Sequence, residues 1–169
     1  MILDNGGALD GTFCMPQWVK DLAEAQKVRI SHERTVSEAR TLRDRLIADT
    51  APEIWGEFAL NLMEAVGDFD LDGVHSVATS LPKENLNRIV IGINGDPSSN
   101  MTMDVQFFKD RNTITFHSSD DRYKGKFYFG VNDNGEVLLC SESAFFKSVD
   151  EAVRAILEPV FSAFASHLK

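Results

Sequence analysis

The feature that most restricts the fold is a series of short segments between residues 88 and 141 in which apolar and polar residues alternate. The expected strands are 88–94, 101–108, 112–117, 126–131 and 136–141. Alternation with a period of two is typical of strands with one buried face. The connections between them are too short for the crossover helices that parallel strands need. The sequence therefore predicts a five-stranded antiparallel meander.

One connection of this meander has a recognisable turn sequence. Residues 132–135 read Asn-Asp-Asn-Gly, which suits a type I turn with glycine in the left-handed bulge position. This turn predicts that Val131 pairs with Val137 and that Phe129 pairs with Leu139.

A helix is expected to follow the sheet. Ser148 and Glu151 form a capping box, which is typical of a helix N-terminus. Pro159 removes a backbone amide, so it predicts a kink near Ala155. The apolar stripe indicates that this helix packs on the phenylalanine-rich face of the sheet; it consists of Val149, Val153, Ile156, Leu157, Val160, Phe161, Phe164 and Leu168.

The first half of the chain is expected to be helical. From Pro16 to about Asp49 no interior glycine or proline interrupts a helix-favouring composition. The apolar residues at seven-residue spacing are Trp18, Leu22, Ala25, Val36, Ala39 and Leu46. Arg29 and His32 occupy the middle of this series. Two alternatives follow: a break near Ser31 gives two helices, or one long helix pairs with a symmetry mate.

A second helix is expected directly afterwards. Asp49 or Thr50 is a suitable N-cap, Pro52 suits the first turn, and Gly67 suits the C-terminal end. Its apolar stripe consists of Ile54, Trp55, Phe58, Ala59, Leu62, Met63 and Val66.

These elements predict one α+β domain with four parts. They are an irregular arm at 1–15, a helical region at 16–66, an acidic connector at 67–86, and the sheet with its C-terminal helix at 87–169. The helical region holds the long or kinked helix, and the C-terminal helix is expected to be kinked on one sheet face.

Charge and composition exclude several classes of partner. The net charge is −9 and no basic stripe is present, which argues against nucleic-acid binding. No apolar run is long enough to cross a bilayer, so no membrane partner is expected. Cys14 and Cys140 are isolated from each other and from histidine clusters, which predicts a reducing compartment such as the cytoplasm. No motif indicates a cofactor.

Alternating aspartates raise the question of a calcium site. Asp68, Asp70 and Asp72, followed by glycine, match the first half of an EF-hand loop. Position 12 of that loop is Thr79, which cannot supply two carboxylate oxygens. The two remaining interpretations are a weaker cation site on the three aspartates and a solvated acidic turn.

A second candidate site lies on the polar face of the expected sheet. If a tight turn centred on Asp110 and Arg111 joins the second and third strands, Asp104 faces His117 directly; a three-residue turn would separate them. A carboxylate beside an imidazole raises the pKa of the imidazole and fixes its tautomer. The residues expected to bind a ligand here are Asp104, His117, Tyr128, Gln106 and Thr115. Charged pairs on a sheet face are also common for stability alone.

The sequence therefore favours a small non-catalytic interaction module over an enzyme. Its first helix is long and polar in the middle, which predicts self-association or binding of a protein partner through the N-terminal helices. The alternative is a small-molecule-binding domain with a pocket between the polar sheet face and the helices.

Overall fold

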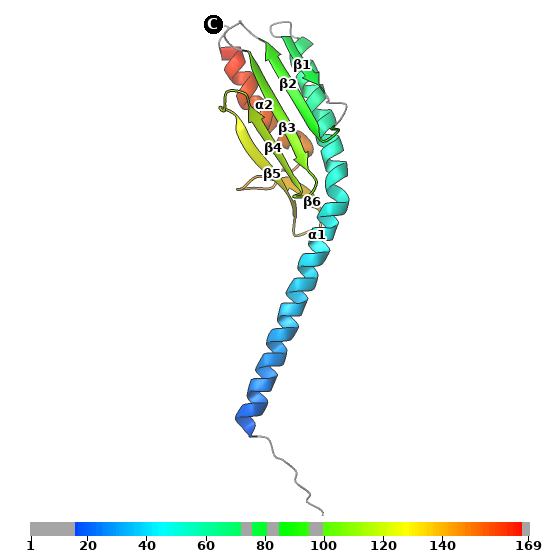
Figure 1. Cartoon of the computed structure of the whole chain (residues 1–169), viewed down its shortest axis with the longest axis vertical. Coiled ribbons are helices and arrows are strands. Elements are labelled where there is room, and N and C mark those ends of the chain that lie inside the picture. Colours follow the sequence, from blue (N-terminus) through cyan, green and yellow to red (C-terminus); the bar gives the residue numbers. More distant parts are fainter. Residues whose placement is uncertain (1–15, 72–75, 81–84, 95–99, 167–169) are drawn as a thin grey trace, which may run out of the picture. The chain divides into compact units, whose positions relative to one another are not determined.

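The computed structural model describes residues 16–71, 76–80, 85–94 and 100–166, and these form two helices and six strands (Figure 1). The chain divides into two compact units, Met1–Thr41 and Leu42–Lys169, and each is described by itself. The arm predicted at 1–15 lies outside the described residues. In chain order the elements are α1 (Gln17–Leu71), β1 (Ser76–Ser80), β2 (Arg88–Asn94), β3 (Met101–Phe108), β4 (Thr113–Ser118), β5 (Lys124–Val131), β6 (Val137–Cys140) and α2 (Val149–Ser166).

The sheet is a fully antiparallel meander in the order β1-β2-β3-β4-β5-β6. The α+β class and the meander order are confirmed, but the predicted strand number of five is wrong. The additional strand, β1, lies in the segment that was expected to be only a connector. Its sequence, SVATS, has no clear alternation, and its five residues are specified by pairing with β2 from Ser76↔Asn94 to Ser80↔Val90.

A single helix, α1, replaces the expected pair of N-terminal helices. It continues through Pro52 and past Gly67, so neither residue marks a helix end. Pro52 cannot donate a backbone hydrogen bond, which costs a helix interior about 3 kcal/mol. The compensating feature is an apolar stripe that crosses the proline without changing face: Ile47, Ala51, Trp55, Phe58, Leu62 and Val66 are all buried.

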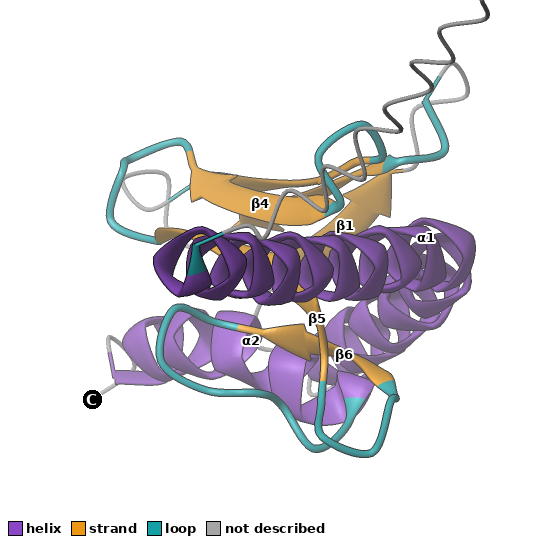
Figure 2. Ribbon diagram, turned by 90° about the horizontal axis from the view of Figure 1, so that it is seen from below, coloured by secondary structure: helices purple, strands orange, loops and turns teal. Residues whose placement is uncertain are grey.

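The core of the second unit lies on one face of the sheet. The buried stripe of α1 and the buried residues of α2 belong to one apolar cluster with alternate residues of the strands. Figure 2 shows the ribbons of α2 and of the strands that contribute to this cluster. Trp55 stacks on Phe107 of β3 with 5.6 Å between ring centroids, and Phe58 meets the edge of Phe127 of β5. Ala152, Val153, Ile156, Leu157 and Val160 contribute the α2 side of the cluster. Both helices therefore cover the apolar face.

Local details of the sheet and of α2 agree with the sequence. The turn at 132–135 has Gly135 at φ +82°, and Val131 pairs with Val137 as expected. At the start of α2 the Ser148 hydroxyl accepts a hydrogen bond from the Glu151 amide at 3.2 Å. The Glu151 carboxylate accepts from the Lys147 amide, one residue before the expected position. α2 contains Pro159, and its predicted kink stays a prediction.

Candidate functional site

The polar face of the sheet contains all five residues expected to bind a ligand. The register places Asp104 directly opposite His117 and Gln106 opposite Thr115, as a tight turn between β3 and β4 requires. Thr115 is in turn opposite Lys126 of β5. The conditional pairing of Asp104 with His117 is therefore confirmed at the level of the backbone.

The two side chains nevertheless bind other partners. Asp104 accepts hydrogen bonds from Arg88 of β2, from Nε at 3.0 Å and from Nη2 at 2.6 Å. His117 Nε2 lies 2.9 Å from a carboxylate oxygen of Asp121, in the turn after β4. Because the Asp104 carboxylate is held by a guanidinium, it does not orient the imidazole as it would in an acid–base pair.

Arg88 is the residue of this face that sequence reasoning missed. Its hydrogen bond and its attraction to Asp104 raise the pKa of the guanidinium above its usual value. Part of the signal was present in the sequence, because the strand 88–94 was expected to lie next to 101–108. The loop between these two strands is long, however, so its length does not specify which residues face each other. Both side chains are partly exposed, 43% for Arg88 and 36% for Asp104, so the ion pair is partly screened by solvent.

Tyr128 lies one row further along the same face. It is opposite Thr113 in the register, and its ring is 5.7 Å from the ammonium group of Lys126. His117 has 56% of its side chain exposed. Binding of a small molecule by this face stays a prediction, because the five residues share one face while both helices cover the other.

The structure describes two of the three aspartates of the expected cation site. Asp68 and Asp70 lie in the last turns of α1, and Asp72 lies outside the described residues. Within the part of the chain that the structure describes, no three His, Cys, Asp or Glu side chains are grouped so that they could hold a metal ion. The cation site stays a prediction.

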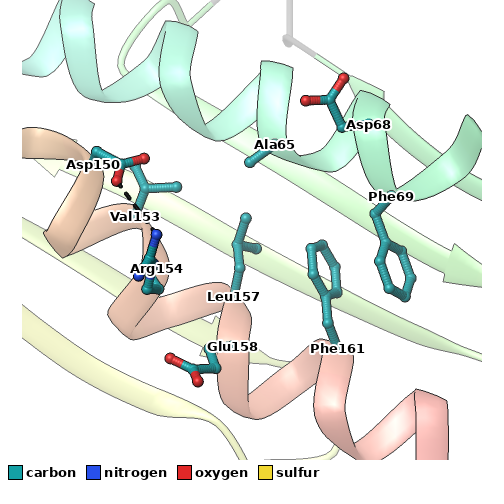
Figure 3. A pocket seen from close by; sticks show the side chains of 9 residues that line it. All are labelled: Ala65, Asp68, Phe69, Asp150, Val153, Arg154, Leu157, Glu158 and Phe161. Atoms are coloured by element: carbon teal, nitrogen blue, oxygen red, sulfur yellow. Dashed lines mark ion pairs between the residues drawn. The ribbon is translucent and has the colours of Figure 1, made fainter.

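A groove lies between the C-terminal part of α1 and α2 (Figure 3). Its volume is about 540 Å³. Phe69 of α1 and Phe161 of α2 stack in parallel with 3.8 Å between their centroids. Ala65, Val153 and Leu157 also line it, and the charged lining residues are Asp68, Asp150, Arg154 and Glu158.

The groove offers apolar surface and charged side chains. Arg154 pairs with Asp150 at 3.9 Å, which leaves Asp68 and Glu158 as acids without an opposite charge in the lining set. Its described lining residues include no serine, cysteine, histidine or lysine.

Two polar groups in the sheet have structural partners. The buried Ser118 hydroxyl donates to Asp120 Oδ1 at 2.7 Å, and this bond, with smaller effects from Arg122, lowers the pKa of Asp120 to about 2. Burial raises the pKa of the Cys140 thiol, which donates to the Tyr128 carbonyl oxygen at 3.4 Å. A thiol with a raised pKa is a poor nucleophile near neutral pH.

Among the residues that the structure describes, exposed large apolar side chains are most numerous on α1 from Gln17 to Thr41, which we call the N-terminal segment. Every side chain from Lys20 to Thr41 is exposed. Trp18 is 65% exposed, Leu22 61% and Val36 54%. They belong, with Ala25 and Ala39, to the seven-residue series noted in the sequence, whose middle is Arg29 and His32. We call the part of this series from Trp18 to Ala39, including Arg29 and His32, the seam.

Comparison with known proteins adds no family assignment: no family model, no curated protein and no solved structure matches the chain. Among the described helices, none is both long enough and apolar enough to cross a membrane. The surfaces above are therefore the only basis for a functional proposal.

Proposed function

We propose that the protein is an interaction module that binds another helix through the N-terminal segment of α1. The observation that carries this proposal is the exposure of every side chain from Lys20 to Thr41, in a helix that also presents Trp18 and Leu22. Exposed apolar side chains in a regular series are typical of a helix–helix interface.

The energy of the segment alone supports the need for a partner. Most helical stability in proteins comes from packing of an apolar face, and no side chain from Lys20 to Thr41 is buried. The segment contains β-branched residues at Val28, Ile30, Thr35 and Val36, which favour helix less. The ion pairs Arg29–Glu33 and Arg34–Glu38 are exposed pairs of the type worth about 0.3–0.5 kcal/mol each.

Association would supply the missing stability. Full burial of a leucine, valine or larger apolar side chain stabilises by roughly 1.5–3 kcal/mol, so three such seam residues outweigh the exposed ion pairs. The polar residues between the apolar ones keep the free segment soluble, which suits a surface that is covered only on binding.

Hydrogen exchange of the full chain tests the proposal. In dilute, monomeric protein the amides of 17–41 are expected to exchange rapidly, while those around Phe58 and Leu62, in the buried part of α1, stay protected. Strong protection of 17–41 in the monomer would show that the segment needs no partner, and would overturn the proposal.

Matched charge variants identify the surface. Leu22→Glu and Val36→Glu place a charge on the seam, whereas Ala23→Glu and Ser37→Glu add the same charge one position further round the helix. When the protein concentration is raised, association is expected to protect the amides of 17–41 from hydrogen exchange. Only Leu22→Glu and Val36→Glu are expected to abolish this protection. Equal effects of all four variants would exclude the seam as the binding surface.

A further inference from the structure

We infer that the helix bound by the N-terminal segment belongs to a second copy of this chain and runs antiparallel to it, with Trp18 opposite Val36. This inference rests on the proposed function and adds the identity of the partner and the register. It follows from the position of the charged residues in the seam: apolar residues occupy both ends, and Arg29 and His32 occupy the middle.

A parallel pair in register is disfavoured. Every seam residue would face its own copy, so Arg29 would meet Arg29 and His32 would meet His32. Two guanidinium groups facing each other at the centre of a narrow interface repel each other. The apolar ends alone would have to hold such a pair together.

An antiparallel pair removes this conflict. The seam alternates between the a and d positions of a heptad, and in an antiparallel coiled coil each a residue faces a d residue of the other helix. The numbers of two facing residues therefore always add up to the same sum. With Trp18 opposite Val36, Leu22 lies opposite His32 and Ala25 lies opposite Arg29. The aliphatic part of the Arg29 side chain can cover the small alanine while its charged end reaches solvent.

Charge complementarity supports the same register. Asp21 lies at the edge of the seam beside Leu22 and so flanks the position that faces His32 of the second copy. The lysines of this half, Lys20 and Lys27, lie on the opposite side of the helix. An acidic side chain of one copy therefore lies near the imidazole of the other.

The neighbouring registers are worse. A shift of one heptad towards the C-terminus sets Arg29 against His32 and Trp18 against Arg43, and Arg43 already donates to the Val131 carbonyl oxygen at 3.3 Å. A shift in the other direction pairs only residues 18–29 and leaves Val36 uncovered. The register with Trp18 opposite Val36 covers Trp18, Leu22 and Val36 and stays within the first unit.

This register also accounts for an exposed valine outside the seam. Its twofold axis passes beside residue 27, so Val28 of one copy approaches Val28 of the other along the edge of the interface. Val28 is 64% exposed in the single chain, and pairing would bury it.

Disulfide exchange between single-cysteine variants tests the orientation. In full chains carrying Cys14→Ser and Cys140→Ser, Leu22→Cys is mixed with His32→Cys in a glutathione redox buffer. The inferred register predicts that the ratio of the mixed disulfide to the two homodisulfides is several-fold higher than the ratio expected from random exchange. Replacing Leu22→Cys by Ala23→Cys, whose side chain points away from the seam, should return the mixture to random proportions.

The outcomes separate this inference from the function on which it rests. Dominant homodisulfides would show a parallel pair, which overturns the inference and leaves the helix-binding function standing. A chain that stays monomeric at every concentration, with rapid exchange in 17–41, would overturn the second copy as partner. Protection of 17–41 in that monomer would overturn both.

Discussion

At the scale of single residues, the turn after β4 shows how a polar side chain is accommodated in the sheet. Ser118 is fully buried, and its hydroxyl both donates to Asp120 and accepts from the Tyr123 amide at 3.0 Å. Asp120 also accepts from the Arg122 amide at 3.1 Å. A buried hydroxyl is tolerated only when it is hydrogen-bonded in this way.

Asp120→Asn is expected to lower the free energy of unfolding by about 1 kcal/mol at neutral pH, because the bonded group is no longer charged. The hydrogen bond from Ser118 lowers the pKa of Asp120 in the folded protein to about 2, below the value near 4 of an unfolded chain. The stability from this group is therefore complete above about pH 4 and is lost as the pH falls towards 2. Urea denaturation of both proteins across this range measures the difference.

Asp133→Asn is the matched control, since it removes the same charge from an exposed position in another turn. Its unfolding free energy should follow that of the wild type at each pH. If Asp120→Asn gave the same acid profile as the wild type, the Ser118–Asp120 bond would have no role in the pH dependence.

Residue-level prediction from the sequence succeeded where alternation and turn length set the register. Asp104 opposite His117 follows from the tight turn between β3 and β4. The actual partners, Arg88 and Asp121, do not follow in the same way. They depend on the β2–β3 register and on a positive φ of 62° at Asp121, which no local pattern in the sequence specifies.

At the scale of elements, the glycines of α1 and β5 have opposite roles. A side chain added at Gly56 or Gly67 in α1 would meet nothing within 4 Å. A side chain added at Gly125 in β5 would collide with the Phe116 ring, which itself packs on Phe127 with 5.3 Å between centroids. Glycine is therefore required in the strand and not in the helix.

Gly56→Ala and Gly67→Ala are each expected to raise the unfolding free energy by roughly 0.5–1 kcal/mol, because alanine loses less backbone entropy on folding. Gly125→Ala should lower it by about 1–3 kcal/mol, since the Phe116 ring has to move within a packed core. Guanidinium denaturation of the three variants measures both effects. A stabilising Gly125→Ala would mean that the ring moves without cost.

The errors of element prediction have a common physical origin in tertiary packing. A proline and a glycine at suitable spacing indicated a separate second helix, but burial of a continuous stripe from Ile47 to Val66 outweighs the lost hydrogen bond at Pro52. The strand β1 is likewise specified by its neighbour β2. The secondary-structure propensity of the local sequence includes neither the burial of this stripe nor the pairing of β1 with β2.

At the scale of the whole molecule, the division after Thr41 separates the proposed interface from the folded core. The core cluster begins at Ile47 among the described residues, and none of the described residues of the first unit, 16–41, belongs to it. No local signal in the sequence marks this boundary, because helix-favouring composition continues across it without a glycine or proline.

Deletion of residues 1–41 is therefore expected to leave the unfolding free energy of the second unit within about 0.5 kcal/mol of the full chain, as for changes remote from a core. The truncated protein should also stay monomeric at concentrations where the full chain associates. Urea denaturation followed by circular dichroism and sedimentation velocity measure the two properties. As a positive control, Phe58→Ala in the same truncated chain should cost about 3–5 kcal/mol.

The continuity of α1 across the unit boundary lowers the free-energy cost of forming helix in the N-terminal segment. Formation of the first turn is the unfavourable step in making a helix, with a nucleation constant of about 10⁻³. Each later residue is added at a free-energy change close to zero. The buried turns after Ile47 act as a permanent nucleus, so the N-terminal segment can elongate from them without a nucleation step. Fraying should then increase steadily from Thr41 towards Gln17, and a binding partner would need to supply only the small cost of propagation.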